Sequence, residues 1–560
     1  IMKKLQRDIS LHNIRRGENS MKKWILVIAL FVVAAALAAC GQDDTPKTGS
    51  SNSGTEEQHL RLNLGGEPYT LDPAFASDTT SWWVIDSIYS GLYRKGENGE
   101  PVLELAKSVD VSEDGKTYTF TLHEGLEWSN GDSLTAHDFE YAWKRVLNPE
   151  TAAYSPSSLY FIEGAEAYNL GEATAEEVGI EATNDTTLVV QLVDPINFFP
   201  KIATGSAYYP VNQKVVEADD KWATEAETLV SNGAFKMKTW DHNAEIILEK
   251  NDVYVEADEV KLDIVSFQMV ADANTEFQLY KSGEIDVLVT VPADMLTSVK
   301  DDEELVTYEG FSVSTYSFNV DEKPVNNEKI RQAFSYAIDR QAFVDNVLKG
   351  GQKPAYGYVS YGVVGEDGKD YRDSAPEEYY TFDPEKAQKL LAEGLQEEGL
   401  TELPAVTLKT NAEGVNKKSA EVVQEMLKQN LGIEITIETQ EWKTYIDTFK
   451  QKNFQVARMG WVGDFLDPYP VLALYRSTSS SNFTNWKNEK FDQLLDKSLQ
   501  AKTEKERFEI LHEAESILMK ELPILPINFS NENSLIRKTV EGITTDPLSK
   551  PNFIFAEIKE

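Results

Sequence analysis

The residue types that carry out covalent or metal chemistry occur in this chain without the spacing that such chemistry needs. The six histidines include no His-x-x-x-His pair, and the chain has one cysteine. Zinc sites and the Gly-x-Ser-x-Gly turn of a hydrolase are therefore not indicated. The sequence also lacks the glycine-rich loops that bind ATP or dinucleotides. The 93 Asp and Glu residues form close pairs by chance, so paired carboxylates are weak support for a glycosidase.

One short segment, RMGWVGDFLDPY beginning at Arg458, has the composition of a ligand-binding stretch. Gly460 and Gly463 permit another backbone to come close, and Trp461 supplies a flat apolar wall. Asp464, if half-buried, needs a cationic partner, and the ammonium group of a ligand is one such partner. The alternative is structural, with Asp464 capping the following turn and Arg458 pairing with a neighbouring acid.

The single cysteine, Cys40, closes a pattern typical of lipoprotein signal peptides. A basic start at Met21-Lys22-Lys23 precedes an apolar run over residues 24–37 and two alanines. The alternatives are a buried free cysteine and a membrane helix, but the run is shorter than the roughly 20 residues that a span needs. We expect residues 1–39 to comprise an upstream, untranslated segment and a signal peptide from Met21. Cys40 is then the lipid attachment site, and residues 40–58 form a flexible tether.

The composition limits the partners and the number of domains. The formal net charge is −39, which makes nucleic acid and anionic lipid headgroups poor partners. Hydrophobic residues make up 41% of the chain, enough to build cores, and cores stop growing near about 250 to 300 residues. We therefore expect two or three lobes that are stabilised by packing, without disulfides.

Alternating apolar residues predict several short strands. Tyr118, Phe120 and Leu122 alternate with threonines, a period of two that is typical of a half-buried strand. The segments 188–192 and 244–248 predict two further strands, and the residues just before Arg458 are strand-like.

Apolar residues at helical spacing predict three long helices. The pattern over 327–348 predicts one continuous helix that is capped by Asn326 or Asn327 and ends at Gly350-Gly351. The stripe over 419–431 predicts a second helix that stops at Gly432 and leads into a strand. The third, 504–522, is closed by prolines and leads into irregular chain with strand-like pieces near 553–558. Such helix-glycine-strand units indicate an α/β fold.

Motifs along nearly the whole chain from Leu60 onward resemble the family 5 extracellular solute-binding proteins, the receptors of peptide importers. Within that family they are most similar to the receptors for oligopeptides. The matching segments are Ala106–Leu122, Trp128–Asp132, Thr135–Phe139, Ser231–Phe235, Phe318-Asn319, Ile330–Arg340, Pro354–Gly357, Gln440–Thr444 and Gly460-Trp461.

The resemblance implies roles for individual residues. Asp464 would bind the α-amino group of a peptide, and Arg458 would meet a carboxylate or other acidic group. The backbone around Gly460 and after Leu71-Asp72-Pro73 would hydrogen-bond the peptide as an added strand, with Trp461 beside it. The lining positions are Tyr154, Trp442, Asn411 and Asn416. Asn416 and Phe449 depart from the histidine and arginine of some relatives, so a preference for longer or less tightly held peptides is a further hypothesis.

The resemblance also implies the fold, which is a type II (cluster C) periplasmic-binding-protein-like α/β fold. Two lobes are joined by two hinge crossings, and an extra domain is inserted in the first lobe. We place the first lobe at residues 59–90, 210–315 and 530–560, the inserted domain at 91–209, and the second lobe at 316–529.

The function implied is that of a lipid-anchored receptor, not an enzyme, which captures short peptides in a closing cleft. It would deliver them to the permease and ATPase subunits of an ABC importer. We expect a monomer on the outer face of the membrane of a Gram-positive bacterium, without cofactor, metal or nucleic acid. The alternatives within the family are signalling peptides, murein peptides, nickel, haem and oligosaccharides, and a surface glycosidase is a remote alternative.

Overall fold

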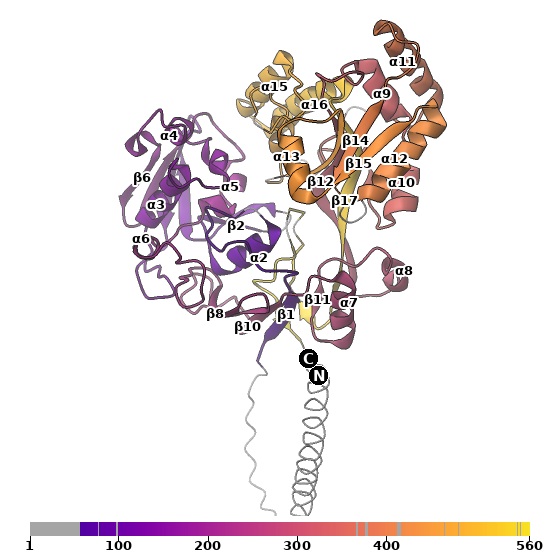
Figure 1. Cartoon of the computed structure of the whole chain (residues 1–560). Coiled ribbons are helices and arrows are strands. Elements are labelled where there is room, and N and C mark those ends of the chain that lie inside the picture. The colour runs from indigo at the N-terminus through magenta and orange to yellow at the C-terminus, as the bar shows by residue number, and fades with distance from the viewer. Residues whose placement is uncertain are drawn as a thin grey trace, which may run out of the picture. The chain divides into compact units, whose positions relative to one another are not determined.

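The computed structural model covers the region that carries the predicted lobes (Figure 1). It describes residues 57–76, 78–96, 99–365, 368–375, 379–411, 416–463, 465–479, 481–545, 547–548 and 550–559. The predicted lipid attachment site Cys40, the signal peptide and nearly all of the tether lie outside these residues. Within the described ranges, no helix combines the length and the apolar character needed to cross a membrane.

The first sheet joins strands that are far apart in the sequence. Its order is β1 (His59–Asn63), β10 (Ile264–Gln268), β9 (Glu245–Lys250) and β8 (Phe235–Asp241). β1 is parallel to β10, and the remaining pairs are antiparallel. β9 confirms the strand predicted over 244–248.

A second sheet is built from the strands β4 (Ala106–Val111), β5 (Thr117–Leu122), β7 (Thr187–Gln191) and β6 (Ile180–Asn184), in that order. All of its pairs are antiparallel, and β5 and β7 confirm the strands predicted at 118–122 and 188–192. Helix α3 (Ala136–Leu147) packs against β6 and β7. The sheet, drawn in violet in Figure 1, lies within the predicted inserted domain.

The third sheet has seven strands and contains the two longest ones. Its strand order is β11 (Val287–Leu288), β17 (Ile524–Ile536), β12 (Leu305–Phe318), β16 (Val456–Val462), β14 (Val406–Asn411) and β15 (Ile435–Gln440). The seventh strand, β13 (Lys353–Pro354), pairs with β17. β12 and β17 are antiparallel, with a register shift between Glu309 and Val313. The predicted lobe boundaries at 315 and 530 fall inside these two continuous strands. The domain bounds themselves stay a prediction.

The remaining elements are shorter or cover the sheets. They are α2 (Thr79–Ile88), β2 (Tyr93–Lys95), β3 (Pro101–Leu103), η2 (Pro156–Leu159), α4 (Ala165–Asn169), η3 (Ala175–Glu177), α5 (Phe199–Ile202), η4 (Ser206–Tyr208), α6 (Gln213–Ala218), α7 (Ala273–Ser282), α8 (Leu296–Val299), α9 (Glu328–Tyr336), α10 (Arg340–Phe343), η5 (Val344–Leu348), α11 (Pro384–Glu397), α12 (Asn416–Leu431), α13 (Trp442–Lys450), α14 (Pro468–Ala473), α15 (Glu489–Leu499), α16 (Glu504–Glu521), β18 (Val540–Glu541) and β19 (Glu557–Ile558).

Helices cover both faces of the third sheet, as expected for an α/β fold. Val456 of β16 packs in one cluster with residues of α9, α11 and α12. Its neighbour Ala457 packs in another cluster with Tyr445 and Phe449 of α13. Because successive residues of a strand point to opposite faces, these two clusters lie on opposite sides of the sheet.

The prediction of one helix over 327–348 is wrong. The structure has α9, a break, α10 and the π-helical turn η5. Asn327 does cap the start, but Asp339 caps a second start by accepting a hydrogen bond from Ala342 N. Arg340 is turned into the interior, where its guanidinium donates to the carbonyls of Ser335 and Pro526. An inward-facing arginine is invisible to an apolar periodicity, which is why the break was missed.

The predictions for the second and third helices are confirmed, but the chain after the third is not irregular. α12 ends before Gly432, which has a φ of 69°, and β15 follows. α16 ends at Glu521, and the next 13-residue strand, β17, contains Pro526. Pro526 lies at the register shift between Ser314 and Thr315 of β12. Proline is tolerated in a strand at such an irregularity, so the prolines end the helix without ending the regular structure.

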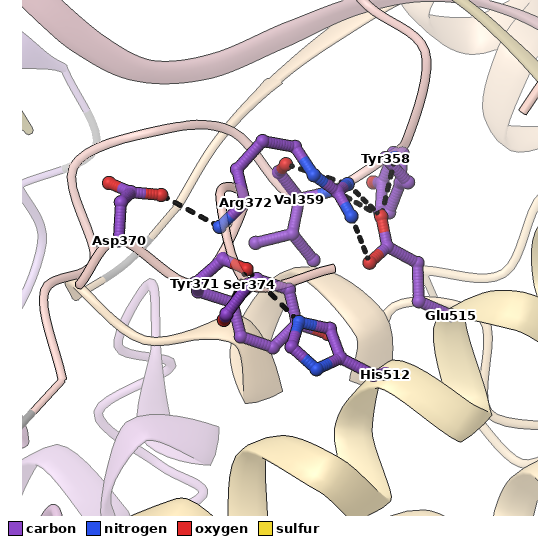
Figure 2. Close-up of polar contacts among 8 residues, drawn as sticks. All are labelled: Tyr358, Val359, Asp370, Tyr371, Arg372, Ser374, His512 and Glu515. Carbon is purple, nitrogen blue, oxygen red and sulfur yellow. Dashed lines mark hydrogen bonds and ion pairs between the residues drawn. The ribbon is translucent and has the colours of Figure 1, made fainter. Parts of the chain in front are cut away.

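A buried ion pair fixes the loop segments around Tyr358 and Arg372 to α16 (Figure 2). The two guanidinium ends of Arg372 bind the two oxygens of Glu515, whose Oε1 also accepts from the backbone N–H groups of Tyr358 and Val359. His512, one turn earlier in α16, stacks on Tyr371 at 4.0 Å between ring centroids and donates from Nε2 to its carbonyl. Burial lowers the pKa of His512.

Candidate functional site

Most of the predicted binding residues lie at one edge of the third sheet. β14, β15 and β16 are parallel, so their carboxyl ends meet at the same edge, which we call the binding edge. Asn411 is the last residue of β14, and Gly460 and Trp461 are near the end of β16. In open α/β sheets, ligands bind outside the carboxyl ends of the strands. The backbone therefore gathers these positions where a ligand is expected.

Two of the predicted binding residues, Asp464 and Trp442, are described only in part or not at all. Asp464 lies outside the described residues, and so does the side chain of Trp442, although the backbone of Trp442 starts α13. In the sequence, Asp464 follows the last residue of β16 by two positions, and α13 begins two positions after the last residue of β15. The role of each stays a prediction.

Arg458 is a half-buried cation at the binding edge. Its Nη2 donates to the hydroxyl of Ser314 at 3.2 Å, and burial lowers the pKa of the guanidinium. Among the residues that the structure describes, no carboxylate forms an ion pair with Arg458. The expected alternative, in which Arg458 pairs with a neighbouring acid, is therefore not seen there. A buried charge without a counterion is costly, so this guanidinium favours an acidic partner.

Two tyrosines border Arg458 and were missed by the sequence reasoning. Tyr316 of β12 lies opposite Arg458 in the strand register, and its buried hydroxyl has no hydrogen-bond partner among the described residues. The hydroxyl of Tyr445 donates to the carbonyl of Arg458. Burial raises the pKa of both tyrosines, so both hydroxyls keep their protons at neutral pH. Among the described residues, Arg458 is thus bordered by the neutral hydroxyls of Tyr316 and Tyr445.

Gly460 lies within β16 and Gly463 directly follows it, and the two glycines serve different purposes. A β-carbon added at Gly460 would meet only Val313 O at 3.6 Å and Arg458 Nη2 at 3.8 Å, which are ordinary contacts. The chain's own packing does not demand a glycine there, and the position stays open to a ligand backbone. A β-carbon at Gly463 would lie 2.2 Å from Cε1 of Phe311. Gly463 is therefore needed for internal packing, and the expectation that it admits another backbone is wrong.

Trp461 presents both an apolar ring and an unused donor. Its ring packs against the largest core cluster, and it pairs with Val313 in the strand register. Its buried indole N–H has no acceptor within the described part of the chain. Buried polar groups are usually hydrogen-bonded, so an orphan donor at a ligand-binding edge is a candidate contact for a ligand carbonyl.

Asn411 and Asn416 are brought together, whereas Phe449 is not part of the edge. Asn416 Nδ2 donates to Asn411 Oδ1 at 3.0 Å, so the first residue of α12 is tied to the last residue of β14. Phe449 stacks on Phe454 at 5.1 Å between centroids inside the cluster under α13. An apolar residue at position 449 is thus explained by packing.

Tyr154 and the chain after Leu71 lie together in the first part of the molecule. The backbone N–H of Tyr154 donates to Ala74 O at 2.9 Å, and the Tyr154 side chain is 60% exposed. Asp72 accepts two hydrogen bonds from Arg145, at 3.0 and 2.6 Å. Asp72 therefore orders this segment through its side chain, and Tyr154 offers an exposed ring beside it.

The residues around Arg458 could not be found from sequence spacing. Ser314 and Tyr316 lie more than 140 positions earlier in the chain and reach Arg458 only through the pairing of β12 with β16. No group of His, Cys, Asp or Glu side chains suited to a metal ion occurs among the residues described.

Comparison with known proteins places the chain among solute-binding proteins. The model of the bacterial extracellular solute-binding proteins, family 5 Middle, matches residues 100–483. The dipeptide-binding protein DppE of Bacillus subtilis is 38% identical over 529 residues, which cover 94% of this chain and 97% of that protein. The oligopeptide-binding protein OppA of the same organism is 38% identical and covers 93% and 97%. The structure of Listeria monocytogenes OppA bound to peptide matches with a TM-score of 0.77 at 28% identity, and covers 90% of this chain and all of that one.

Proposed function

The chain belongs to family 5 of the bacterial extracellular solute-binding proteins, and from this membership we propose that it binds short peptides outside the cell and delivers them to an ABC-type importer. The family consists of solute-binding proteins and not of enzymes. The predicted α/β fold of the type II periplasmic binding proteins is confirmed by the same matches.

Arg458 is the observation that carries the proposal of a peptide ligand. Arg458 is half-buried, and within the described ranges its guanidinium is hydrogen-bonded to the neutral hydroxyl of Ser314 alone. A guanidinium matches a carboxylate in charge and geometry, and such charge-assisted pairs are strong when water is excluded. We propose that the carboxylate of a peptide, at its C-terminus or on an acidic side chain, supplies the missing charge.

The peptide backbone is proposed to follow β16. Gly460 leaves room beside its own backbone, and the indole N–H of Trp461 lacks an acceptor among the described residues. Recognition through backbone groups gives affinity that depends little on side chains. Asp464, directly after Gly463 in the sequence, is proposed to bind the α-amino group of the same peptide. Asn411, Asn416, Trp442 and Tyr154 are proposed as lining residues.

The lipid anchor is part of the proposal. Cys40 follows a basic start, an apolar run and small residues, which is the pattern that lipoprotein processing requires. We propose a lipid-anchored monomer on the outer face of the membrane. Metabolic labelling with an alkynyl fatty acid should label the wild-type chain in its host and leave the Cys40→Ser variant unlabelled, whereas equal labelling of both would contradict this.

Native mass spectrometry of the freshly purified protein tests the proposed ligand class. We expect additional mass that fragments into peptides of several sequences, because recognition through backbone and termini tolerates many side chains. The Asp464→Asn variant should lose most of this additional mass, and the control Asp447→Asn, an exposed carboxylate on α13, should keep it. Additional mass that corresponds to nickel, haem or an oligosaccharide would contradict the peptide proposal.

A further inference from the structure

An aromatic cluster joins the predicted inserted domain to the predicted second lobe. Phe198, 3% exposed, stacks on Phe465 with 5.5 Å between ring centroids and an interplanar angle of 16°. Phe198 also contacts Tyr469 at 5.6 Å, and Phe161 meets both Phe198 and Tyr469 edge-on at 5.7 and 6.3 Å. Phe161 and Phe198 come from the first part of the chain, whereas Phe465 and Tyr469 follow β16.

A charged pair completes the site that receives Phe198. The guanidinium carbon of Arg507 lies 4.7 Å from the centroid of the Phe198 ring. Asp467 holds this guanidinium through two hydrogen bonds, one of 2.9 Å from Nη1, and its carboxylate also accepts from Tyr469 N at the start of α14. Asp467 and Arg507 are 1% and 3% exposed. Asp467 thus fixes the flat face of Arg507 against the Phe198 ring, an arrangement that favours a cation–π contact.

Two further contacts extend the same junction. Asn197 Nδ2 donates to Ala501 O at 3.2 Å. A β-carbon added at Gly99 would lie 2.4 Å from Cδ1 of Leu466, so Leu466 packs directly on the backbone of that glycine. Both contacts again join the first part of the chain to residues after β16.

The junction is continuous with the binding edge. Phe465, Leu466 and Asp467 follow β16 in the sequence, and Gly463 N donates to Phe311 O of the crossing strand β12 at 3.1 Å. A ligand that holds the end of β16 therefore also holds the surface on which Phe198 packs. When the junction opens, water can hydrate the guanidinium face of Arg507 and the amide of Asn197. Opening therefore leaves neither group without hydrogen-bond partners.

We propose that Phe198 is a latch between the predicted inserted domain and the predicted second lobe. The latch closes these two parts onto each other when peptide is bound and releases them when peptide leaves. This inference rests on the proposed peptide-binding function. Because the closed arrangement is the one competent to hold peptide, weakening the latch lowers the apparent affinity by lowering the closed population. By the same linkage, bound peptide strengthens the latch.

The first test removes the aromatic ring. The Phe198→Ala variant should bind an unmodified pentapeptide at least tenfold more weakly than wild type, mainly through faster dissociation, as measured by stopped-flow fluorescence. The control Val193→Ala changes a 43% exposed side chain in the same segment and should leave the affinity unchanged. An unchanged dissociation rate for Phe198→Ala would overturn the latch.

The second test asks whether the junction opens at all. The full chain carrying Cys40→Ser, Asn197→Cys and Ala501→Cys allows the junction to be closed by a disulfide on oxidation and reopened by dithiothreitol. Oxidation should slow both peptide entry and peptide exit at least a hundredfold. Exchange that is as fast in the oxidised as in the reduced protein would show a permanent interface and overturn the latch.

A ligand-free measurement separates failure of the latch from failure of the proposed function. Without peptide, small-angle X-ray scattering should give a smaller radius of gyration for the oxidised protein than for the reduced protein, because the junction is otherwise released. If wild type does not bind peptide but the radii differ in this way, the junction opens as proposed and the peptide proposal fails. If peptide binds normally and all radii agree, the latch is overturned.

Discussion

Replacing the buried Glu104 by Gln should stabilise the protein at alkaline pH and not at acidic pH. Glu104 is 4% exposed and directly follows β3. Its Oε1 accepts hydrogen bonds from Tyr254 at 2.7 Å and Ser90 at 3.1 Å, and no cation contacts it directly among the described residues. Burial raises the pKa of Glu104 from 4.5 to about 7, against the hydroxyl bonds and nearby Arg94, while Glu256 adds repulsion.

The sign and size of the effect follow from that shift. Between pH 4.5 and 7 the folded protein keeps a proton on Glu104 that the unfolded chain has lost, so the free energy of unfolding falls as the pH rises through this window. Each pKa unit corresponds to about 1.4 kcal/mol, so the full loss is about 3 kcal/mol. Gln stays neutral and still accepts from Tyr254, so the Glu104→Gln variant avoids this loss.

Urea unfolding at pH 5 and pH 8 measures the difference. We expect Glu104→Gln to equal wild type at pH 5 within about 1 kcal/mol, and to exceed it by about 2 to 3 kcal/mol at pH 8. The control Glu124→Gln changes an exposed glutamate nearby and should show no such pH dependence. If Glu104→Gln is less stable than wild type at pH 8, the carboxylate is charged and stabilising, and the reasoning is refuted.

Three further predictions concern the binding edge and the loop fixed to α16. The Arg458→Gln variant should have the same free energy of unfolding as wild type without ligand, or a higher one, because the change removes a charge that is costly to bury. In calorimetry it should bind a pentapeptide at least tenfold more weakly, which is about 1.4 kcal/mol. A variant that loses stability and keeps its affinity contradicts the proposed role. Gly463→Ala should destabilise by about 1 to 3 kcal/mol in urea unfolding because of the Phe311 ring, whereas Gly460→Ala should lower peptide affinity and not stability; equal stability losses would refute this distinction. Because the pKa of His512 is lowered in the folded state, the wild-type free energy of unfolding should fall as the pH drops below about 6.5, and a His512→Gln variant that falls equally would show that another group is responsible.

Local features of the chain were predicted well because the sequence carries their signals directly. The stripe of α12, the stop at Gly432 and the strand β15 are set by residues within one short window. β17 was missed because its longest partner, β12, lies more than 200 positions away in the sequence, and its proline suggested irregular chain. The inward-facing Arg340 interrupted a helix that apolar spacing alone makes continuous.

The binding edge likewise combines features that the local sequence predicts with features that depend on distant residues. The composition of the segment at 458–464 singled it out, because it combines a cation, an acid, a tryptophan and two glycines. Ser314, Tyr316 and Tyr445, which surround Arg458, reach it only through strand pairing and helix packing. The different purposes of Gly460 and Gly463 depend on where the Phe311 ring lies, which no local pattern reveals.

Isothermal titration calorimetry with one pentapeptide in free and N-acetylated form tests the central claim most directly. If Asp464 binds the α-amino group in a site closed to water, acetylation leaves the carboxylate unpaired and should weaken binding at least a hundredfold, about 3 kcal/mol. The Asp464→Asn variant should bind the two forms within about threefold of each other, and Asp447→Asn should retain the full difference. Equal affinity of wild type for the free and acetylated peptides would contradict the account.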